Sequence, residues 1–474
     1  MHRVRHQSIV YAAVLALLLS ACAPAATPAP TAAPTQPPPT AAPTQPPPTV
    51  APTDTQAPTA APTAAPSDTP APTEAPTTAP AATLSGTINW MVLADPEQVK
   101  SFNAVADAFQ TQYPGVKVNV IDAADEEEDY HAQLGTSLAG GNPPDVINLD
   151  YDATGQYAAS GALAPLDDDI AGSSLIHATD FYTVAWDGFQ WQGKQICIPI
   201  SVSGLMVYYN KKLFDDAKLA YPKAGWTWDD FLSDAKALTK GTDQYGVVIE
   251  PEFNNLLPFV WQNGGDLLSA DGKELGLASP EGTAAVQFFV DLQSKYHVAP
   301  DQEAAESQEG PDRFVDGKLG MLISSRADVP SLRVITDFDW DAAPLPQMKQ
   351  AADILKSDGM CLPAKAKNPD LGWKLVEFAT SPAGQQIMAS MGRIVPSNIA
   401  VSQSPAFLTP NGAPANSQVW LDVIPTLRIV PQLAHWPDLE ETGNEELENA
   451  FYGHATATQA VQEMIDKTKQ YLAP

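Results

Sequence analysis

Positively charged side chains are scarce in this chain of 474 residues. It contains 26 Lys and Arg against 56 Asp and Glu, which gives a formal net charge of −30 and a pI near 4.3. Nucleic acids and anionic membranes are bound through basic surfaces. The composition therefore argues against nucleic acid or an anionic membrane as the partner and fits a neutral or cationic ligand better.

Motifs of catalysis and metal binding are also missing. The sequence has no Gly-x-Ser-x-Gly elbow, and its seven His show no metal-site spacing. Residues 188–195 have the spacing of a phosphate loop, but Gln195 stands where Ser or Thr would hold Mg²⁺. The acidic run at 125–129 lacks the glycine and spacing of a calcium loop. We expect no enzymatic activity, no cofactor and no metal.

Cysteine is rare, with three residues in the whole chain. Cys22 belongs to the N-terminal segment described next, which leaves Cys197 and Cys361. Each of these two lies in a strand-like stretch, at 195–200 and 359–363. Disulfides persist in exported proteins, so a bond across neighbouring strands and a pair of buried free thiols both remain open.

The apolar run near the N-terminus, at 9–19, is too short to span a bilayer, which takes roughly 20 residues. Arg3 and Arg5 precede it, as in a secretory signal. The Leu-Ser-Ala-Cys that follows resembles the lipobox of bacterial lipoproteins. That resemblance implies a signal peptide at 1–21, acyl chains such as palmitate on Cys22, and a membrane anchor through lipid only. An ordinary cleaved signal is the alternative.

A Pro-rich segment separates this anchor from the rest of the chain. Residues 23–83 hold 19 of the 45 prolines, and Thr-Ala-Ala-Pro-Thr-Gln-Pro-Pro-Pro occurs at 31–39 and again at 40–48. Proline fixes φ and lacks a backbone donor, so such a segment stays extended and solvated. We interpret residues 22–83 as a disordered linker.

From residue 84 onwards the composition is globular, and about 390 residues exceed a single core, which predicts two lobes. Hydrophobic periodicity predicts alternating strands and helices, which favours an α/β class. The predicted elements are strands at 86–93, 116–121 and 145–149, and helices at 99–113 and 130–138. Helix starts are further predicted at a capping Thr227 and at Ser279-Pro280, Asn368-Pro369 and Ser381-Pro382.

Seven short segments, in order along the chain, carry a family resemblance. They are Tyr-Pro-Gly-Val-Lys-Val at 113–118, Leu-Ala-Gly-Gly-Asn-Pro-Pro-Asp-Val at 138–146, Tyr-Tyr-Asn-Lys-Lys-Leu-Phe at 208–214, Gly-Trp-Thr-Trp-Asp-Asp-Phe at 225–231, Trp-Gln-Asn-Gly-Gly-Asp at 261–266, Ser-Pro-Glu at 279–281 and Phe-Val-Asp-Gly-Lys at 314–318. Together they resemble the extracellular solute-binding proteins of sugar-importing ABC transporters over nearly all of residues 85–400. The last seventy residues resemble that family only loosely.

The resemblance implies a two-lobed periplasmic-binding fold of the class II type, each lobe a sheet flanked by helices. One lobe would hold 85–199 and 352–398, and the other 200–350 and 399–474. The lobes would close by hinge motion on a carbohydrate and deliver it to the permease subunits of an ABC transporter. The protein would be an extracytoplasmic, monomeric receptor anchored to the cell membrane by lipid.

Candidate ligand-binding residues follow from the needs of sugar recognition, which are flat apolar faces for the ring and fixed polar groups for the hydroxyls. Such groups belong at the carboxyl ends of parallel strands. Asp95 and Glu97 follow the first predicted strand, and Tyr151 and Asp152 follow the third. Two further candidates, Ser201 and Ser203, stand where the chain would cross between the lobes, and each has a hydroxyl group. The alternative for each is an ordinary loop, turn or cap role.

Three candidates come from the second lobe. Trp261 and Asn263 are cleft residues by resemblance, with core packing as the alternative for Trp261. Family members often carry an aromatic residue after the Gly-Lys motif, but this chain has Ser-Ser-Arg-Ala-Asp at 324–328. Arg326 would instead donate to hydroxyls or to an anionic group. Lower-ranked candidates are Trp340, Arg393 and Trp436.

Other functions stay open at this point. The many acids could supply the carboxylate pair of a surface-anchored glycosidase. An importer receptor for a non-sugar solute, or an adhesion module, would use the same fold.

Overall fold

The computed structural model describes residues 84–93, 96–122, 127–409 and 412–472. The predicted signal peptide, Cys22, the Pro-rich linker and Asp95 lie outside these ranges. Glu97 falls within the first helix, but its side chain is outside the described part.

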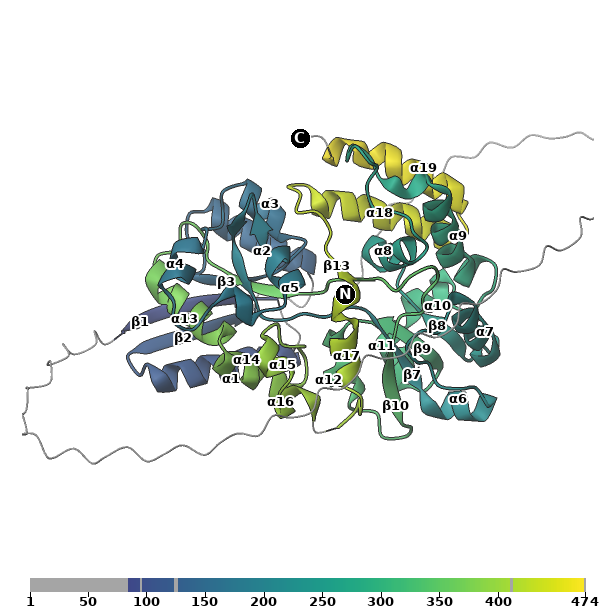
Figure 1. Ribbon diagram of the computed structural model, residues 1–474, viewed down its shortest axis with the longest axis horizontal. Coiled ribbons are helices and arrows are strands. Elements are labelled where there is room, and N and C mark those ends of the chain that lie inside the picture. The colour runs from purple at the N-terminus through teal and green to yellow at the C-terminus, as the bar shows by residue number, and fades with distance from the viewer. Residues whose placement is uncertain (1–83, 94–95, 123–126, 410–411, 473–474) are drawn as a thin grey trace, which may run out of the picture. The chain divides into compact units, whose positions relative to one another are not determined.

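A mixed five-stranded sheet contains the N-terminal strands (Figure 1). From edge to edge its strands are β2 (Val116–Asp122), β1 (Gly86–Val92), β3 (Val146–Asp150), β12 (Asp358–Cys361) and β6 (Cys197–Pro199). β1 runs parallel to β2 and β3, whereas β12 is antiparallel to both β3 and β6. The predicted βαβ unit is confirmed, because α1 (Pro96–Gln112) connects β1 to β2.

A second, four-stranded sheet forms from the middle of the chain. Its strands are, in order, β10 (Trp340–Pro344), β7 (Met206–Asn210), β9 (Leu319–Ser324) and β8 (Tyr245–Val248). β7 is antiparallel to both of its neighbours, and β8 is parallel to β9. Every residue of β7 and β8 is buried. The sheet is therefore covered on both faces, and the α/β class is confirmed.

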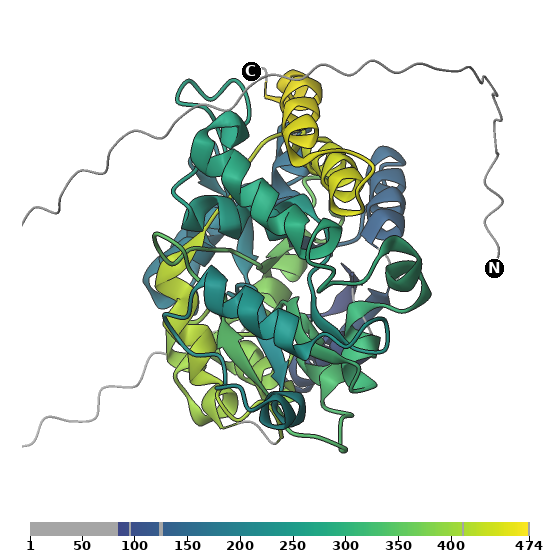
Figure 2. The same cartoon turned by 90° about the vertical axis from the view of Figure 1, so that its right-hand side faces the viewer.

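Helices surround both sheets (Figure 1). In the first half of the chain they are α2 (Glu127–Ala139), α3 (Thr154–Ala159), α4 (Asp167–Gly172), α5 (Thr183–Gly188), α6 (Lys211–Ala217), α7 (Trp228–Leu238) and α8 (Phe253–Gln262). The second half contributes α9 (Pro280–Ser294), α10 (Gln302–Ser307), α11 (Gly310–Val315), α12 (Val329–Leu332), α13 (Pro369–Thr380), α14 (Pro382–Met391), α15 (Ile399–Ser402), α16 (Pro405–Leu408), α17 (Gln418–Val423), α18 (Trp436–Phe451) and α19 (Ala457–Thr468). Helices α18 and α19 pack on each other and on α9 (Figure 2).

All four predicted helix starts are confirmed, although the caps differ. Thr227 forms a capping box with Asp230, and Ser279 accepts from the backbone of Gly282. Asn368 and Ser381 precede a proline at the first helical position, but neither side chain caps its helix. The proline, with its fixed φ, marks those two starts.

Short stretches connect the two sheets and lie beside one another. The chain leaves β6 through 200–205, and a second stretch at 352–357 leads into β12. An isolated bridge pairs Ser203 with Lys356, and another pairs Ser201 with Pro396. The small parallel pair β11 (Asp353–Ile354) and β13 (Leu427–Arg428) adjoins them. These are the crossings that a two-lobed fold requires, whereas the exact lobe boundaries stay a prediction.

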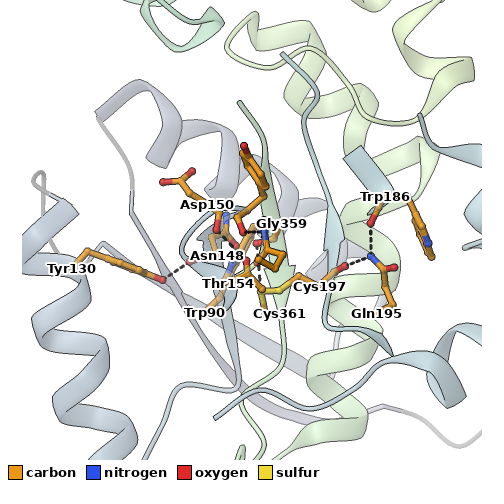
Figure 3. The surroundings of a disulfide bond; sticks show 12 residues. Trp90, Tyr130, Asn148, Asp150, Thr154, Trp186, Gln195, Cys197, Gly359 and Cys361 are labelled. Atoms are coloured by element: carbon orange, nitrogen blue, oxygen red, sulfur yellow. Dashed lines mark hydrogen bonds between the residues drawn. A yellow bond between two sulfur atoms is a disulfide. The ribbon is translucent and has the colours of Figure 1, made fainter. Parts of the chain in front are cut away.

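A disulfide joins Cys197 and Cys361 in the first sheet (Figure 3). The two residues stand directly opposite each other on β6 and β12, with their Cα atoms 4.3 Å apart. Both strands adjoin the connecting stretches, so the bond cross-links the sheet next to the crossings. The sequence left this pairing open because strand neighbours are not visible in it.

Candidate functional site

A cavity of about 710 Å³ lies where strands of both sheets end. On the side of the first sheet it is lined by Leu93 after β1 and by the residues that close β3. On the side of the second sheet it is lined by the loop after β9 and by the start of α8, which follows β8. Ser201, Ser203 and Lys356, from the connecting stretches, complete it. The expectation of a site at the carboxyl ends of strands fits this position.

Charged residues of both signs line the cavity, with acids in excess. The basic residues are Arg326, Lys356 and Arg393. The acidic residues are Asp150, Asp152, Glu252, Asp358, Glu440 and Glu441. No tryptophan belongs to the described lining, which includes the aromatic residues Tyr130 and Tyr151. The cavity is therefore polar and acceptor-rich.

One end of the cavity is built around Asn254, the second residue of α8. Its Nδ2 donates to Asp152 Oδ2 at 3.1 Å and to Glu440 Oε1 at 2.5 Å. Trp436 donates its indole N–H to the other Glu440 oxygen at 3.1 Å. We call Asp152, Glu252, Asn254, Glu440 and Glu441 the acidic end. The hydrogen bond from Asn254 to Asp152 links an element of the second sheet to a loop of the first.

Lys356 lies among these acids, on a connecting stretch. Its backbone exchanges two hydrogen bonds with Ser203, of 2.7 and 2.9 Å, which fix its position. Burial by itself lowers the pKa of the Lys356 ammonium, but the surrounding carboxylates, Asp152 foremost, outweigh it and raise the pKa above its ordinary value. Lys356 is therefore charged at neutral pH, although within the described ranges it makes no direct ion pair.

Asn148, on β3, belongs to the lining of the cavity. Its Oδ1 accepts from the indole N–H of Trp90 at 2.8 Å. Because an indole nitrogen can only donate, this bond identifies the oxygen, and the other amide atom is therefore Nδ2. Nδ2 is buried and has no hydrogen-bond partner in the described part of the chain. Asn148 therefore offers an unused donor to a bound molecule.

Arg326 lies at a different part of the cavity, which we call the arginine end. Its guanidinium carbon is 4.3 Å from the ring centre of Trp420, and its Nε donates to Gly392 O at 3.0 Å. The side chain is only 2% exposed. Both Nη atoms have no hydrogen-bond partner among the described residues. Burial lowers the pKa of Arg326 to about 10, so the group still carries its charge at neutral pH.

The structure brings five of the predicted site residues to the cavity and leaves others out. The five are Tyr151, Asp152, Ser201, Ser203 and Arg326, and the lower-ranked Arg393 lines the cavity as well. The Tyr151 ring is fully buried, and its hydroxyl accepts from the backbone of Val430 at 3.3 Å. The side chain thus packs behind the wall and is not a stacking platform.

Trp261 and Asn263 lie away from the cavity lining, and Trp261 packs in the core, which was the alternative for it. Trp261 is 3% exposed within α8, and Arg428 lies over its ring at 5.5 Å. Asn263 donates to Glu281 O at 2.8 Å and so ties the end of α8 to the start of α9. Neither residue lines the cavity. Trp340 and Trp436 are likewise buried outside its lining.

The sequence reasoning missed Asn148, Asn254, Lys356 and Glu440. Asn148 carried a usable signal, since it is a polar residue between apolar neighbours in a buried strand. The other three lie at the start of α8, on a connecting stretch and on α18. Their proximity depends on the packing of separate elements.

Comparisons with known proteins point to one family. The sequence profile described as "Bacterial extracellular solute-binding protein" matches residues 94–386. The diacetylchitobiose binding protein DasA of Streptomyces coelicolor is 27% identical over 282 residues, which cover 57% of this chain and 64% of that protein. The maltotriose-binding protein of Pyrococcus abyssi is 23% identical over 300 residues, 60% of this chain and 61% of the relative. In both relatives the match spans less than two thirds of their length.

A solved structure agrees in fold. The ABC substrate-binding protein of Listeria monocytogenes in complex with cycloalternan superposes with a TM-score of 0.77 at 26% identity. That match covers 81% of this chain and 98% of the other. The two-lobed binding-protein fold therefore accounts for nearly all of the described residues.

Proposed function

Since the chain belongs to the bacterial extracellular solute-binding protein family, we propose that it captures a carbohydrate in its cavity and delivers it to the permease of an ABC importer. One observation carries the proposal, namely a polar cavity at the strand ends of two sheets. A hydrogen bond from Asn254 to Asp152 joins its two sides. The relatives named for diacetylchitobiose and maltotriose, and the complex with cycloalternan, support the choice of a sugar.

The lining suits a molecule with many hydroxyls. Carboxylates accept hydrogen bonds from hydroxyl groups, while Asn148 and Lys356 provide donors. A buried polar atom without a partner destabilises the protein by about 1–3 kcal/mol, and a ligand that bonds to it removes that penalty. Asn148 Nδ2 and Asn254 Oδ1 are such atoms. Their pairing with ligand would favour the bound state.

Closure of two lobes around the sugar is part of the proposal. The lobes would hold 85–199 with 352–398 and 200–350 with 399–474, and the connecting stretches would act as the hinge. The protein would work outside the cytoplasm as a monomer, held to the membrane by acyl chains on Cys22. None of the described helices has the length and apolar character of a membrane span.

We propose further that the protein performs no covalent chemistry, as in a pure receptor. The alternative, a glycosidase, has one observation in its favour, since Asp152 and Glu440 both bond to Asn254 Nδ2. A glycosidase needs two carboxylates about 5–9.5 Å apart on opposite sides of the scissile bond. Here Asn254 Nδ2 bonds to both carboxylates and so occupies the space between them in which the scissile bond would have to lie. Receptor function is therefore the better explanation.

Thermal unfolding of the protein with a panel of mono- and oligosaccharides tests this proposal, with peptides, polyamines and phosphorylated polyols as controls. Ligand at 100 times its Kd adds about 2.7 kcal/mol to the free energy of unfolding, which raises Tm visibly. We expect one class of sugar to raise Tm without being consumed, as followed by chromatography. Stabilisation by non-sugars alone would contradict the choice of carbohydrate, and product formation would establish the enzyme.

A further inference from the structure

The stretches that connect the two sheets are bonded to one another as a unit. Ser203 and Lys356, one from each stretch, exchange two backbone hydrogen bonds of 2.7 and 2.9 Å. The Leu355 N–H donates to Arg428 O on β13 at 2.9 Å and so adds a third segment. Hinge closure rotates the lobes about such connections. A side chain on this unit therefore keeps its place beside the cavity in the open and in the closed protein.

Five residues of this region line the cavity, and four of them use their polar side chains within the region itself. Ser201 Oγ accepts from the Asp358 backbone at 2.8 Å and approaches the Asp358 carboxylate at 3.3 Å. Ser203 donates to the next carbonyl along the chain at 3.1 Å, and Ser357 donates to Ser201 O at 2.6 Å. The fifth residue is Lys356, and its side chain behaves differently.

The Lys356 ammonium makes no hydrogen bond or ion pair with any residue that the structure describes. The residue is partly exposed, and its Nζ keeps accessible surface, unlike the two Nη atoms of Arg326. The carboxylates that act on its charge, Asp152 foremost, all belong to the cavity lining, as does Lys356. The ammonium therefore faces the cavity with its donors unused.

The chemistry of this position favours an uncharged oxygen. An ammonium has three donors and no acceptor, so it binds a group that accepts. A protonated amine of a ligand would meet a like charge at Lys356. A carboxylate or phosphate would meet the carboxylates of Asp152, Glu252 and Glu440, which already act on this lysine. A hydroxyl suits both neighbours, because it accepts from the ammonium and donates to a carboxylate.

We infer that the ligand docks first at Lys356, whose ammonium donates to an uncharged oxygen of the sugar while the lobes are open, and that the lobes then close around this contact. The inference rests on the proposed function, and it narrows the ligand to a sugar without charge at this point. It also gives the connecting stretch a role in recognition beside its role as a hinge. Residues of the two lobes complete the contacts on closure.

Binding kinetics test this order of events. Stopped-flow tryptophan fluorescence with glucose, maltose, maltotriose, cellobiose and lactose should give an observed rate that levels off as the sugar concentration rises. The concentration at half of the plateau reports docking, and the plateau reports closure. Lys356→Met keeps the length of the side chain and removes its donors. The half-plateau concentration should therefore rise about tenfold or more and the initial slope should fall equally, while the plateau stays within about twofold.

Matched variants and charged probes control the experiment. Lys365→Met removes the same charge from an exposed position beyond β12, and should leave docking and closure within about twofold. Lys356→Arg keeps a charged donor and should recover most of the affinity measured by calorimetry. Glucose 6-phosphate and glucosamine test the two signs of charge. Circular dichroism and Tm show whether each variant is folded, and Lys356→Gln replaces Lys356→Met if the latter does not fold.

The possible outcomes separate the inference from the proposed function. If Lys356→Met binds as tightly as the natural protein, or loses affinity only through faster release at an unchanged half-plateau concentration, first docking at Lys356 is overturned and the carbohydrate receptor stands. Tighter binding of glucose 6-phosphate or glucosamine than of every neutral sugar, lost in Lys356→Met, overturns the uncharged class. Absence of binding by every sugar to the natural protein counts against the carbohydrate receptor itself and overturns the inference with it.

Discussion

The two charged ends of the cavity are built in opposite ways. At the arginine end, Arg326 is enclosed by protein, lies against the Trp420 ring and donates to a backbone carbonyl at the end of α14. At the acidic end, several carboxylates surround one amide and one lysine, and the amide keeps an unused acceptor. The first arrangement packs a cation between elements and leaves its two Nη atoms without a partner among the described residues. The second leaves one amide oxygen without a partner beside several carboxylates.

This contrast teaches that a charge in a cavity wall is not by itself a binding residue. Desolvation dominates for an enclosed group, as the lowered pKa of Arg326 indicates. Burial is also the largest single influence on Lys356, but several neighbouring carboxylates together outweigh it, as the raised pKa of Lys356 indicates. Enclosed charges should therefore affect stability, and cavity-facing charges should affect binding. Substitutions of each kind of charge test this division between enclosed and cavity-facing groups.

The largest expected effect on the free energy of unfolding comes from the disulfide, which belongs to neither end of the cavity. Replacing both disulfide cysteines, Cys197→Ser with Cys361→Ser, should lower the free energy of unfolding by about 2–5 kcal/mol. The bond closes a sequence separation of 164 residues, and neither cysteine lines the cavity. Urea unfolding measures the loss, and ligand affinity should stay within about twofold. A loss of affinity at unchanged stability would show that the bond controls the cavity through the crossings.

Asp353 is an enclosed acid and should behave like Arg326. It lies outside the cavity lining, and burial raises its pKa to about 7. Between about pH 4, its pKa in the unfolded chain, and about pH 7 the folded state keeps a proton that the unfolded state loses. Stability should therefore fall as pH rises through this window, by at most about 4 kcal/mol in total. Asp353→Asn should remove that part of the pH dependence.

Urea unfolding at intervals from about pH 4 to 8 measures the slope of stability against pH for both proteins. The natural chain should lose more stability than Asp353→Asn over this range. Equal slopes would show that Asp353 titrates as an ordinary carboxylate, and hence that enclosure does not govern its charge.

Arg326→Ala tests the arginine end directly. Removal of the side chain leaves a cavity beside Trp420 and Phe407, which should lower the free energy of unfolding by about 2–4 kcal/mol. Arg326→Met keeps most of the packing and removes the buried charge, so it should be more stable than the alanine variant. If both variants instead retain stability and lose ligand affinity equally, the arginine end is a binding site and the division fails.

Asp152→Ala tests the acidic end. The substitution should weaken ligand binding by about 1.5–3 kcal/mol if the carboxylate bonds to ligand in a dry cavity. The free energy of unfolding should change less. The substitution removes the hydrogen bonds that Asp152 accepts from Asn254 and from the backbone of Ala153. Titration calorimetry and urea unfolding separate the two quantities. Unchanged affinity would reduce Asp152 to a structural link between the two sides of the cavity.

The fold could be predicted from the sequence because its signals are local. Periodicity marked β1, α1 and β2, and proline at the first helical position marked α13 and α14. The order of residues from Thr227 to Asp230 was enough to predict a helix start at a capping Thr, which the structure shows as a capping box. These features depend on residues within one or two turns of each other, so they need no knowledge of packing.

The site could be predicted only in part, because its contacts are distant in sequence. Asp152 and Ser203 followed from strand ends and a crossing. Asn254 reaches Asp152 across 102 positions and Glu440 across 186, and no local pattern encodes such pairs. Trp261 stayed open between core and cleft, because an aromatic residue on a helix has the same local sequence pattern in both positions.

The smallest expected effect separates two serines on the same crossing. The Ser203 hydroxyl donates to the neighbouring Gly204 O at 3.1 Å, so Ser203→Ala should weaken binding by less than about 0.7 kcal/mol, or roughly threefold. The Ser201 hydroxyl accepts from the Asp358 backbone at 2.8 Å and approaches its carboxylate at 3.3 Å, so Ser201→Ala should lower stability by about 1 kcal/mol. Parallel calorimetry and urea unfolding compare the pair. If Ser203→Ala loses more binding free energy than Asp152→Ala, the hydroxyl contributes more to binding than the carboxylate. The principal ligand contacts would then lie at the crossing and not at the acidic end.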